Sequence, residues 1–525
     1  MNSADATGPD VTAPRPRSEP FQADADSPDD RLTEVIPAGL PPGNAAAPDG
    51  VQTAVLPGRT ERPDESPAEG RTEGKAGRRR WLRRGRTQTP NAEPDGEPVP
   101  AQNVRTRART GAAQEAPTGH LAPEAVFARL EAATAHLEPP FAVLDRAAFR
   151  ANAVALTRRA SGTPLRIASK SLRCRTALIE ALSLDGFAGV LGYSLPEAIW
   201  LASNDAFSDV VVGYPTANRA AIAELAGSEQ LAERITLMID SVDQLDLIDD
   251  VVPPERRAEI RVCLDLDSSL LLGGGRVHVG VRRSPVHTPA DAAVLARRVA
   301  LRKGFRISGL MSYEAQIAGV GDAPPGRFFR GLAVRWMQRR SWAELLARRA
   351  AVVDAVQGAL EQVGAHPLRF VNAGGTGSVE KTAADPVVTE VAAGSGLYGP
   401  TLFDAYRAFT PRPAALFAVP VVRRPARGWV TAAGGGWVAS GPPGPDRLPT
   451  PVYPPGLKFA PTEAAGEVQT PLQGEAAEDL RLGDRIWFRH AKAGELCEHV
   501  DVLHVVDGDR VVDVVPTYRG EGKAF

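Results

Sequence analysis

Residues 166–174 read "RIASKSLRC", and the helical pattern "RTALIEAL" (175–182) follows them directly. The apolar run that starts at Pro164 predicts a buried strand, and this strand ends on Lys170. Strand ends often reach solvent, and a solvated lysine at such an end requires no functional role. The same position also suits a lysine that forms a Schiff base. The rest of the chain decides between these two interpretations.

The unit of a strand followed by a helix recurs through residues 120–408. Near-continuous Val/Ile/Leu strands that alternate with helices are typical of a parallel sheet covered by helices. About eight such units favour an α/β fold closed into a (β/α)8 barrel, in which Lys170 ends the second strand. A doubly wound sheet is the alternative, but it requires a Gly-rich turn after an early strand, and "FAVLDRAAF" (141–149) has none. The predicted strands are "FAVLD" (141–145), "LRIASK" (165–170), "FAGVLGYS" (187–194), "DVVVGYP" (209–215), "ITLMIDS" (235–241), "IRVCLDLD" (260–267), "FRISGLMSYEAQ" (305–316), "LRFVNAGGTGS" (368–378) and "EVAAGSGLYG" (390–399).

The regions on either side of this pattern differ from it. Residues 409–525 show short strands separated by Gly/Pro turns, with a hairpin signal at Asp507-Gly508, which predicts an all-β domain. Residues 1–119 are rich in Pro and Ala and have two aromatic residues, Phe21 and Trp81, which predicts a disordered tail. Within this tail, "RTEGKAGRRRWLRRGR" (71–86) is a solvated charge run or a contact for nucleic acid or a membrane surface.

The net charge, the cysteine count and the length of the apolar runs argue against several classes of protein. The 525 residues have a net charge of -2, so we expect no general attraction to nucleic acid outside the basic tail. Three cysteines are too few for a disulfide scaffold and favour a reducing, cytoplasmic location. No apolar run reaches the roughly 18 residues of a membrane span, and the first residues lack the apolar core of a signal peptide.

Two Gly-rich loops follow the last predicted barrel strands. "NAGGTGS" (372–378) and "GSGLYGP" (394–400) expose backbone N–H groups in a way that suits a phosphate. In barrels of this kind, phosphate sites are often formed by the loops after the last strands. A lysine and a phosphate cradle at the same end of a barrel suit pyridoxal phosphate, which needs an imine partner and an anion anchor.

Three motifs together resemble a known family. They are Lys170-Ser-Leu-Arg-Cys174, Tyr313-Glu-Ala-Gln316 and Gly374-Gly-Thr-Gly377. Over residues 125–520 the chain is similar to the fold-type III pyridoxal-phosphate enzymes, whose barrel is of the alanine racemase type. Within them it most resembles the D-threonine aldolase / D-serine dehydratase branch, including the actinobacterial amino acid deaminase/aldolase proteins. The chain departs from that branch at two positions, because Ala168, two residues before Lys170, and Gln316 stand where the branch has histidines.

The resemblance implies roles for individual residues. Lys170 would form the Schiff base with the cofactor and transfer protons, with Tyr313 as a second catalytic residue. Arg166 and Tyr193 would approach the cofactor ring, although Arg166 could instead pair with an acid in the barrel floor, and both tyrosines could be packing residues. Glu197 matches the same loop as Tyr193. The phosphate would be held by Gly375, Thr376, Gly377, Ser378, Gly396, Leu397 and Tyr398.

The branch also holds a divalent metal, such as zinc or manganese, in its β-domain. Here the matching residues are Glu495, Cys497 and His499, which would share one face if the segment were a strand. The alternative is a surface ion pair beside a small buried thiol. A separate segment, "RVCLDLDSSLLLGGGRVHVGVRRSPV" (261–286), places Asp265 and Asp267 before three cationic residues that could bind a substrate carboxylate: Arg276, His278 and Arg282. A solvated loop with ion pairs is the alternative, and the two aspartates could also bind a metal.

The expected function is that of a lyase on a D-amino acid with a β-hydroxyl, of the D-threonine or D-serine type. Such an enzyme cleaves the Cα–Cβ bond or eliminates water and ammonia. A racemase on the same barrel and a non-catalytic cofactor-binding protein are the alternatives. A metal-dependent hydrolase would require a His-x-His after the first strand, which "FAVLDRA" lacks. A small amino-acid substrate and a homodimer are the partners that the resemblance implies.

Overall fold

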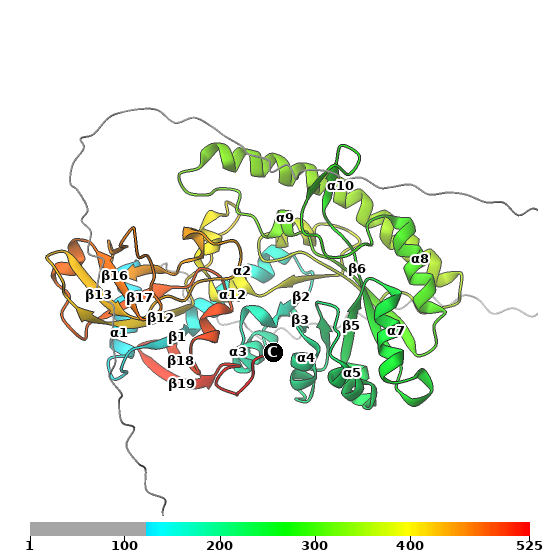
Figure 1. Ribbon diagram of the computed structural model, residues 1–525, viewed down its shortest axis with the longest axis horizontal. Helices are drawn as coiled ribbons and strands as arrows, with labels where there is room; N and C mark the ends of the chain where they lie inside the picture. The colour runs from blue at the N-terminus through cyan, green and yellow to red at the C-terminus, as the bar shows by residue number, and fades with distance from the viewer. Residues whose placement is uncertain (1–121) are drawn as a thin grey trace, which may run out of the picture. The chain divides into compact units, whose positions relative to one another are not determined.

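The computed structural model describes residues 122–525, so the predicted disordered tail and its basic segment lie outside the described residues. The predicted barrel is confirmed: eight strands form a closed parallel barrel in the order β10-β11-β2-β3-β4-β5-β6-β9. Helices follow most of the strands and surround the barrel in Figure 1. The barrel strands are β2 (Leu165–Ala168), β3 (Phe187–Gly192), β4 (Val210–Val212), β5 (Ile235–Ile239), β6 (Ile260–Asp265), β9 (Phe305–Ser312), β10 (Phe370–Ala373) and β11 (Glu390–Ala393).

The helices around the barrel begin at recognisable caps. For example, the Ser194 hydroxyl accepts a hydrogen bond from the N–H of Glu197 at the start of α4. The longest helix, α10, packs against α8. The helices are α1 (Pro123–Ala133), α2 (Arg146–Ala160), α3 (Arg175–Leu182), α4 (Leu195–Ala202), α5 (Arg219–Ala226), α6 (Glu229–Arg234), α7 (Val242–Val251), α8 (Pro289–Ala300), α9 (Ala315–Ala318), α10 (Phe328–Glu361), α11 (Val379–Ala383) and α12 (Ser395–Tyr398).

Strand β1 (Phe141–Asp145) corrects one expectation, because it does not belong to the barrel. It pairs antiparallel with β12 (Ala415–Arg423) and parallel with β18 (Val502–Asp507), and Figure 1 shows it in cyan among the orange and red strands. All five residues of β1 are buried, so its apolar run looks the same in either sheet. Lys170 therefore follows the first barrel strand and not the second.

The C-terminal residues form the predicted β-structure. Seven strands of this nine-stranded sheet run in the order β15-β16-β13-β12-β1-β18-β19, and β14 and β17 complete it. The predicted hairpin is confirmed, since Asp507 pairs with Arg510 and Gly508 takes a φ of +63°. The remaining strands are β13 (Trp429–Ala433), β14 (Thr450–Tyr453), β15 (Lys458–Phe459), β16 (Gln469–Gln473), β17 (Arg485–Arg489) and β19 (Arg510–Pro516), and a separate hairpin pairs β7 (Leu270–Leu272) with β8 (Val277–Val279).

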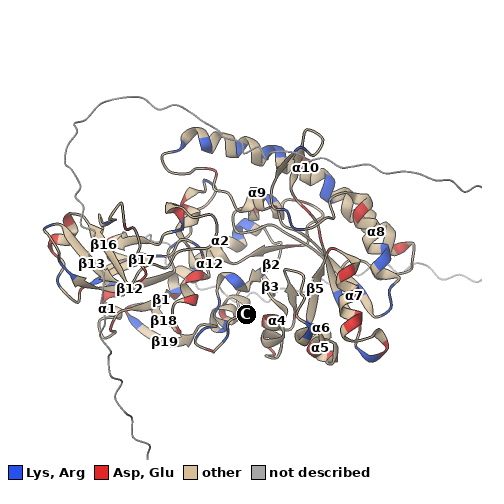
Figure 2. Ribbon diagram, viewed as in Figure 1, with Lys and Arg blue, Asp and Glu red and all other residues tan. Residues whose placement is uncertain are grey.

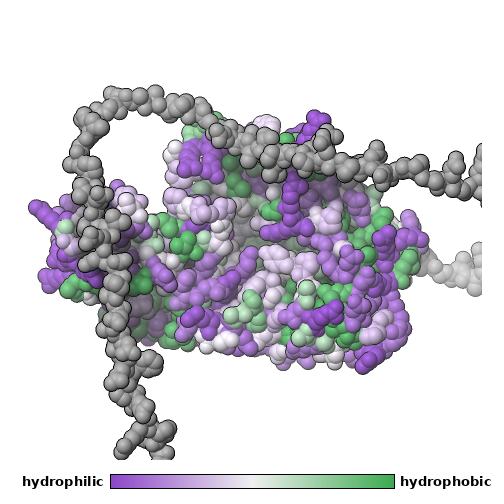
Figure 3. All heavy atoms as spheres, viewed as in Figure 1, coloured by the Kyte–Doolittle hydropathy of each residue, from purple (hydrophilic) through white to green (hydrophobic). Residues whose placement is uncertain are grey.

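The surface carries charged, polar and hydrophobic residues next to one another. Acidic and basic residues are interspersed over the outer helices in Figure 2, in keeping with the small net charge of -2. Hydrophobic residues appear between hydrophilic ones on the face drawn in Figure 3. Within residues 122–525, every helix is too short or too polar to cross a bilayer.

Candidate active site

A cavity of about 420 Å³ opens at the carboxyl ends of the barrel strands, and Lys170 lines it. The strand β2 stops at Ala168, and the 3₁₀ turn Ser169–Ser171 places the lysine just beyond the strand. The Lys170 ammonium group donates a hydrogen bond to the Tyr214 hydroxyl at 3.1 Å. The lysine therefore faces a cavity that can hold a small molecule, and it is not simply a strand end in bulk water.

Both Gly-rich loops reach the same cavity. Gly375, Thr376 and Gly377 line it from the loop after β10, and Gly394 and Ser395 line it from the loop after β11. The N–H groups of Thr376, Gly377 and Ser395 donate to no protein atom among the described residues. A side chain at position 377 would collide with the carbonyl oxygen of Ala318, so only glycine fits there. Free N–H groups around a close backbone turn form a site for an anionic group.

A buried carboxylate fixes the shape of the first loop. Glu314 is fully buried and accepts hydrogen bonds from the Gly374 N–H at 3.0 Å, the Ser378 hydroxyl at 3.2 Å and the Thr382 hydroxyl at 2.6 Å. Arg349 of α10 lies 3.3 Å from the same carboxylate and 2.7 Å from Asp385. The sequence motif contained Glu314 but gave no reason for a buried carboxylate there, because its partners come from two distant segments, residues 374–382 and α10.

The structure brings together part of the predicted residue set. Lys170, Tyr193, Tyr313, Gly375, Thr376 and Gly377 all line the cavity. Four residues predicted for the phosphate lie behind this surface. The Ser378 hydroxyl points to Glu314, and Gly396, Leu397 and Tyr398 are buried, with the Tyr398 hydroxyl donating to the Leu172 carbonyl at 3.0 Å. Gly394 and Ser395 line the cavity in place of Gly396, Leu397 and Tyr398.

Arg166 corrects another expectation, because it lies inside the barrel and does not line the cavity. Its guanidinium group contacts Glu390 at 2.6 Å and Asp209 at 3.1 Å, which is the alternative pairing with acids in the barrel floor. Glu197 is also buried, where it accepts hydrogen bonds from the Tyr193 N–H at 2.6 Å and the Tyr518 hydroxyl at 2.9 Å. Burial raises the pKa of the Glu197 carboxyl. Its hydrogen bond from the Tyr193 N–H supports the loop after β3.

One wall of the cavity carries charged and phenolic groups. Burial, helped by the charge of Asp240, raises the pKa of the Asp265 carboxyl to about 7. Arg283 lies over the rings of Tyr214 and Tyr313, with its guanidinium carbon 5.5 and 5.6 Å from their centroids. Burial also raises the pKa of the Tyr313 phenol, so its hydroxyl keeps its proton at neutral pH.

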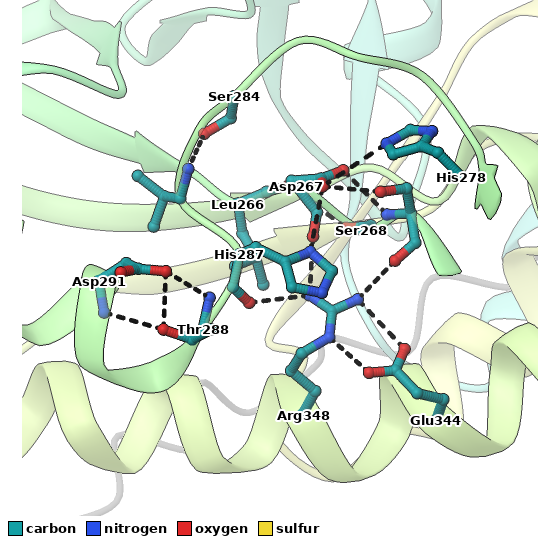
Figure 4. Close-up of polar contacts among 12 residues, drawn as sticks. Leu266, Asp267, Ser268, His278, Ser284, His287, Thr288, Asp291, Glu344 and Arg348 are labelled. Atoms are coloured by element: carbon teal, nitrogen blue, oxygen red, sulfur yellow. Dashed lines mark hydrogen bonds and ion pairs between the residues drawn. The ribbon is translucent and has the colours of Figure 1, made fainter. Parts of the chain in front are cut away.

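None of the three predicted cationic residues lines the cavity. Arg276 and Arg282 are exposed and do not line the cavity, whereas Arg283, which sequence analysis did not single out, does. A polar network supports this wall from outside, as Figure 4 shows: His287 Nδ1 lies 3.1 Å from Asp267, and Arg348 donates to the Asp267 carbonyl at 2.7 Å. His278 belongs to the same network, with Nε2 3.9 Å from the Asp267 carboxylate.

The proposed metal ligands do not converge. Glu495 and Cys497 lie in the 3₁₀ turn Glu495–Glu498, so the expectation of a strand with one shared face is wrong. Glu495 accepts hydrogen bonds from the N–H and hydroxyl of Ser440, Cys497 is buried, and His499 stacks on Trp437 with ring centroids 5.0 Å apart. Burial raises the pKa of the Cys497 thiol. In the described part of the chain, no three His, Cys, Asp or Glu side chains are grouped as metal ligands would be.

Comparison with known proteins agrees with this architecture. Residues 144–401 match the family model described as alanine racemase, N-terminal domain, which confirms the resemblance seen in the sequence motifs. A D-threonine aldolase from Arthrobacter sp. is 26% identical over 284 residues, which cover 52% of this chain and 66% of that relative, just under two thirds of its length.

Two solved structures share the fold. The D-threonine aldolase from Filomicrobium marinum superposes with a TM-score of 0.58 at 22% identity and covers 74% of this chain and 96% of its own. The D-threo-3-hydroxyaspartate dehydratase from Delftia sp. HT23 gives a TM-score of 0.55 at 19% identity and covers 73% of this chain and 98% of its own. The barrel and the C-terminal β-structure therefore occur together in other proteins.

Proposed function

We propose that this chain, with its barrel of the alanine racemase type, is a pyridoxal-phosphate-dependent lyase that acts on a D-amino acid with a β-hydroxyl. The observation that carries the proposal is the single cavity that contains both Lys170 and the unpaired N–H groups of two Gly-rich loops. The names of the Arthrobacter relative and of the two structural neighbours support a D-amino-acid substrate.

The cavity residues fit this cofactor. Thr376, Gly377 and Ser395 offer backbone donors for the phosphate, and Lys170 lies in the same cavity as the partner for the aldehyde. Bound pyridoxal phosphate withdraws electrons from the Cα of an amino acid and thereby weakens the bonds around that carbon. Glu495, Cys497 and His499 do not converge, so these residues do not fit the divalent metal that the sequence resemblance implies.

The other cavity residues bind the substrate and move protons. Arg283 forms no ion pair with a carboxylate among the described residues, so it is available for the α-carboxylate of the substrate. Lys170 would take or return a proton at Cα of the bound substrate, and the Tyr214 hydroxyl, which accepts a hydrogen bond from the lysine, would orient its amine. Tyr313 supplies a neutral hydroxyl on the wall below Arg283.

Substrate turnover distinguishes the candidate reactions. We expect the protein loaded with pyridoxal phosphate to convert D-threonine or D-3-hydroxyaspartate to an aldehyde with glycine, or to a keto acid with ammonia. Interconversion of D- and L-alanine without either product would indicate the racemase alternative. Loss of all activity in Lys170→Ala, with unchanged thermal stability, would tie the reaction to this residue. A homodimer stays a prediction, which light scattering tests.

A further inference from the structure

A second lysine, Lys492, lines the same cavity, and the roles proposed above leave it unused. It follows β17 in the C-terminal β-structure. Its Nζ donates a hydrogen bond to the Ser440 carbonyl at 2.9 Å, and among the described residues no carboxylate oxygen lies within 4.0 Å of it. A half-buried ammonium group that faces a cavity without a carboxylate partner has the capacity to bind an oxygen of a ligand.

The loop that carries Lys492 is held against Lys170. Gly494 packs directly on the Lys170 carbonyl oxygen, so a side chain at this position would collide with it, and its φ of +99° also requires glycine. On its other side, Glu495 accepts hydrogen bonds from the Ser440 N–H at 3.1 Å and hydroxyl at 2.7 Å. The position of Lys492 relative to Lys170 is therefore fixed by backbone packing and by two partners on Ser440.

The surroundings of Lys492 favour proton exchange. Burial lowers the pKa of its ammonium group, and the nearby charges of Arg447 and Lys170 lower it further. Glu495 and Asp446 act in the opposite direction, but the pKa stays below that of a free lysine. The amine therefore exchanges a proton near neutral pH more readily than a surface lysine does.

The cavity places its remaining polar groups around a substrate in a definite order. Under the proposed function, the amino group of the substrate would lie on the Lys170 side, and its carboxylate would bind Arg283, whose guanidinium group lies over the rings of Tyr214 and Tyr313. The polar substituent still without a partner is the oxygen on Cβ, and the β-structure supplies Lys492 for it. We propose that Lys492 binds this β-oxygen and exchanges its proton, an inference that rests on the proposed function.

The proton balance is simple in both candidate reactions. In cleavage, the neutral Lys492 amine takes the hydroxyl proton, the Cβ–O bond becomes a carbonyl, and an aldehyde leaves. The electron pair of the Cα–Cβ bond stays with Cα, which receives a proton from Lys170. In elimination, Lys170 removes the Cα proton and the Lys492 ammonium gives a proton to the hydroxyl. The electron pair of the Cα–H bond then forms the Cα–Cβ double bond, and the hydroxyl leaves with the Cβ–O electron pair as water.

The test compares Lys492→Met with the matched control Lys458→Met, an exposed lysine of the same β-structure, both loaded with pyridoxal phosphate. Proton transfer by a positioned side chain contributes about 10²–10⁴-fold, so we expect kcat on D-threonine or D-3-hydroxyaspartate to fall by that factor in Lys492→Met. The cofactor absorption band and the exchange of the Cα proton of D-alanine with D₂O should match those of the control, because neither involves a β-oxygen.

A second readout needs no turnover. Lysines of the cofactor-free protein are labelled by reductive ¹³C-methylation, and the Lys492 signal is titrated by NMR. Its pKa should lie below that of the Lys458 signal and should rise in Lys170→Ala. A Lys492→Met enzyme with the kcat of the control, or with an equal loss of D-alanine exchange, would overturn this inference and leave the proposed function intact. A wild-type enzyme that converts no β-hydroxy D-amino acid would refute the proposed function itself, and this inference with it.

Discussion

Glu314→Gln is the substitution that tests most sharply how the Gly-rich loop is held. The carboxylate is fully buried, and it joins the Gly374 N–H, two hydroxyl groups and Arg349. The glutamine keeps the size of the side chain but removes its negative charge, and it turns an NH₂ group toward groups that are themselves donors. Breaking a buried ion pair costs about 3–5 kcal/mol. Arg349 keeps Asp385 as a partner, so we expect the free energy of unfolding to fall by about 3 kcal/mol.

The same substitution should weaken cofactor binding, because the N–H groups of Thr376 and Gly377 lose their fixed orientation. A loss of about 1.4 kcal/mol in that interaction would raise the Kd for pyridoxal phosphate about tenfold. The assay combines urea unfolding with a titration of the cofactor followed by absorption. The control is Glu255→Gln, an exposed carboxylate paired with Lys303, which should change neither quantity. If Glu314→Gln unfolded like the wild type and bound the cofactor equally well, the reasoning about the loop would be refuted.

Three further substitutions test other parts of the account. Arg166→Met leaves Glu390 and Asp209 without their shared partner, so it should lower the urea midpoint strongly but leave the cofactor band unchanged, since Arg166 lies outside the cavity. The pKa of Asp265 is raised to about 7, so this carboxyl binds more protons in the native state than in the unfolded state between about pH 4 and 7, and its contribution to stability should fall as pH rises through that window; the free energy of unfolding of Asp265→Asn, measured in urea at each pH, should therefore lack this one contribution when it is compared with that of the wild type. Arg283→Gln should raise KM for the amino acid at least tenfold and leave the Kd for pyridoxal phosphate unchanged, as steady-state kinetics and cofactor titration would show.

The repeating pattern of the sequence was enough to predict the barrel. Buried parallel strands read as continuous Val/Ile/Leu runs, and the intervening helices have a different period. The pattern could not place β1, because its five buried residues fit a barrel strand and a strand of the C-terminal sheet equally well. Its pairing with β12 and β18 depends on contacts with residues more than 250 positions away.

Cavity residues could be identified from the sequence where their role depends on one residue type and its immediate neighbours in the chain. Lys170 and Gly377 could be identified because a lysine at a strand end and a glycine in a tight turn are visible in the sequence itself. Arg283 and Lys492 could not, since only the folded loops show which of several neighbouring cationic residues turns toward the cavity. The strand expected at Cys497 was wrong because the chain turns at Gly494, which has a φ of +99°, and continues as a 3₁₀ turn.

The most direct test of the central claim is the absorption spectrum of the purified protein with pyridoxal phosphate, before and after borohydride, followed by peptide mapping. We predict a visible band that borohydride abolishes, with the cofactor then fixed to the peptide that contains Lys170. Lys170→Ala should show neither the band nor the label. A protein that shows no band with added cofactor, or one in which borohydride fixes the cofactor to Lys492 and leaves Lys170 free, would contradict the account.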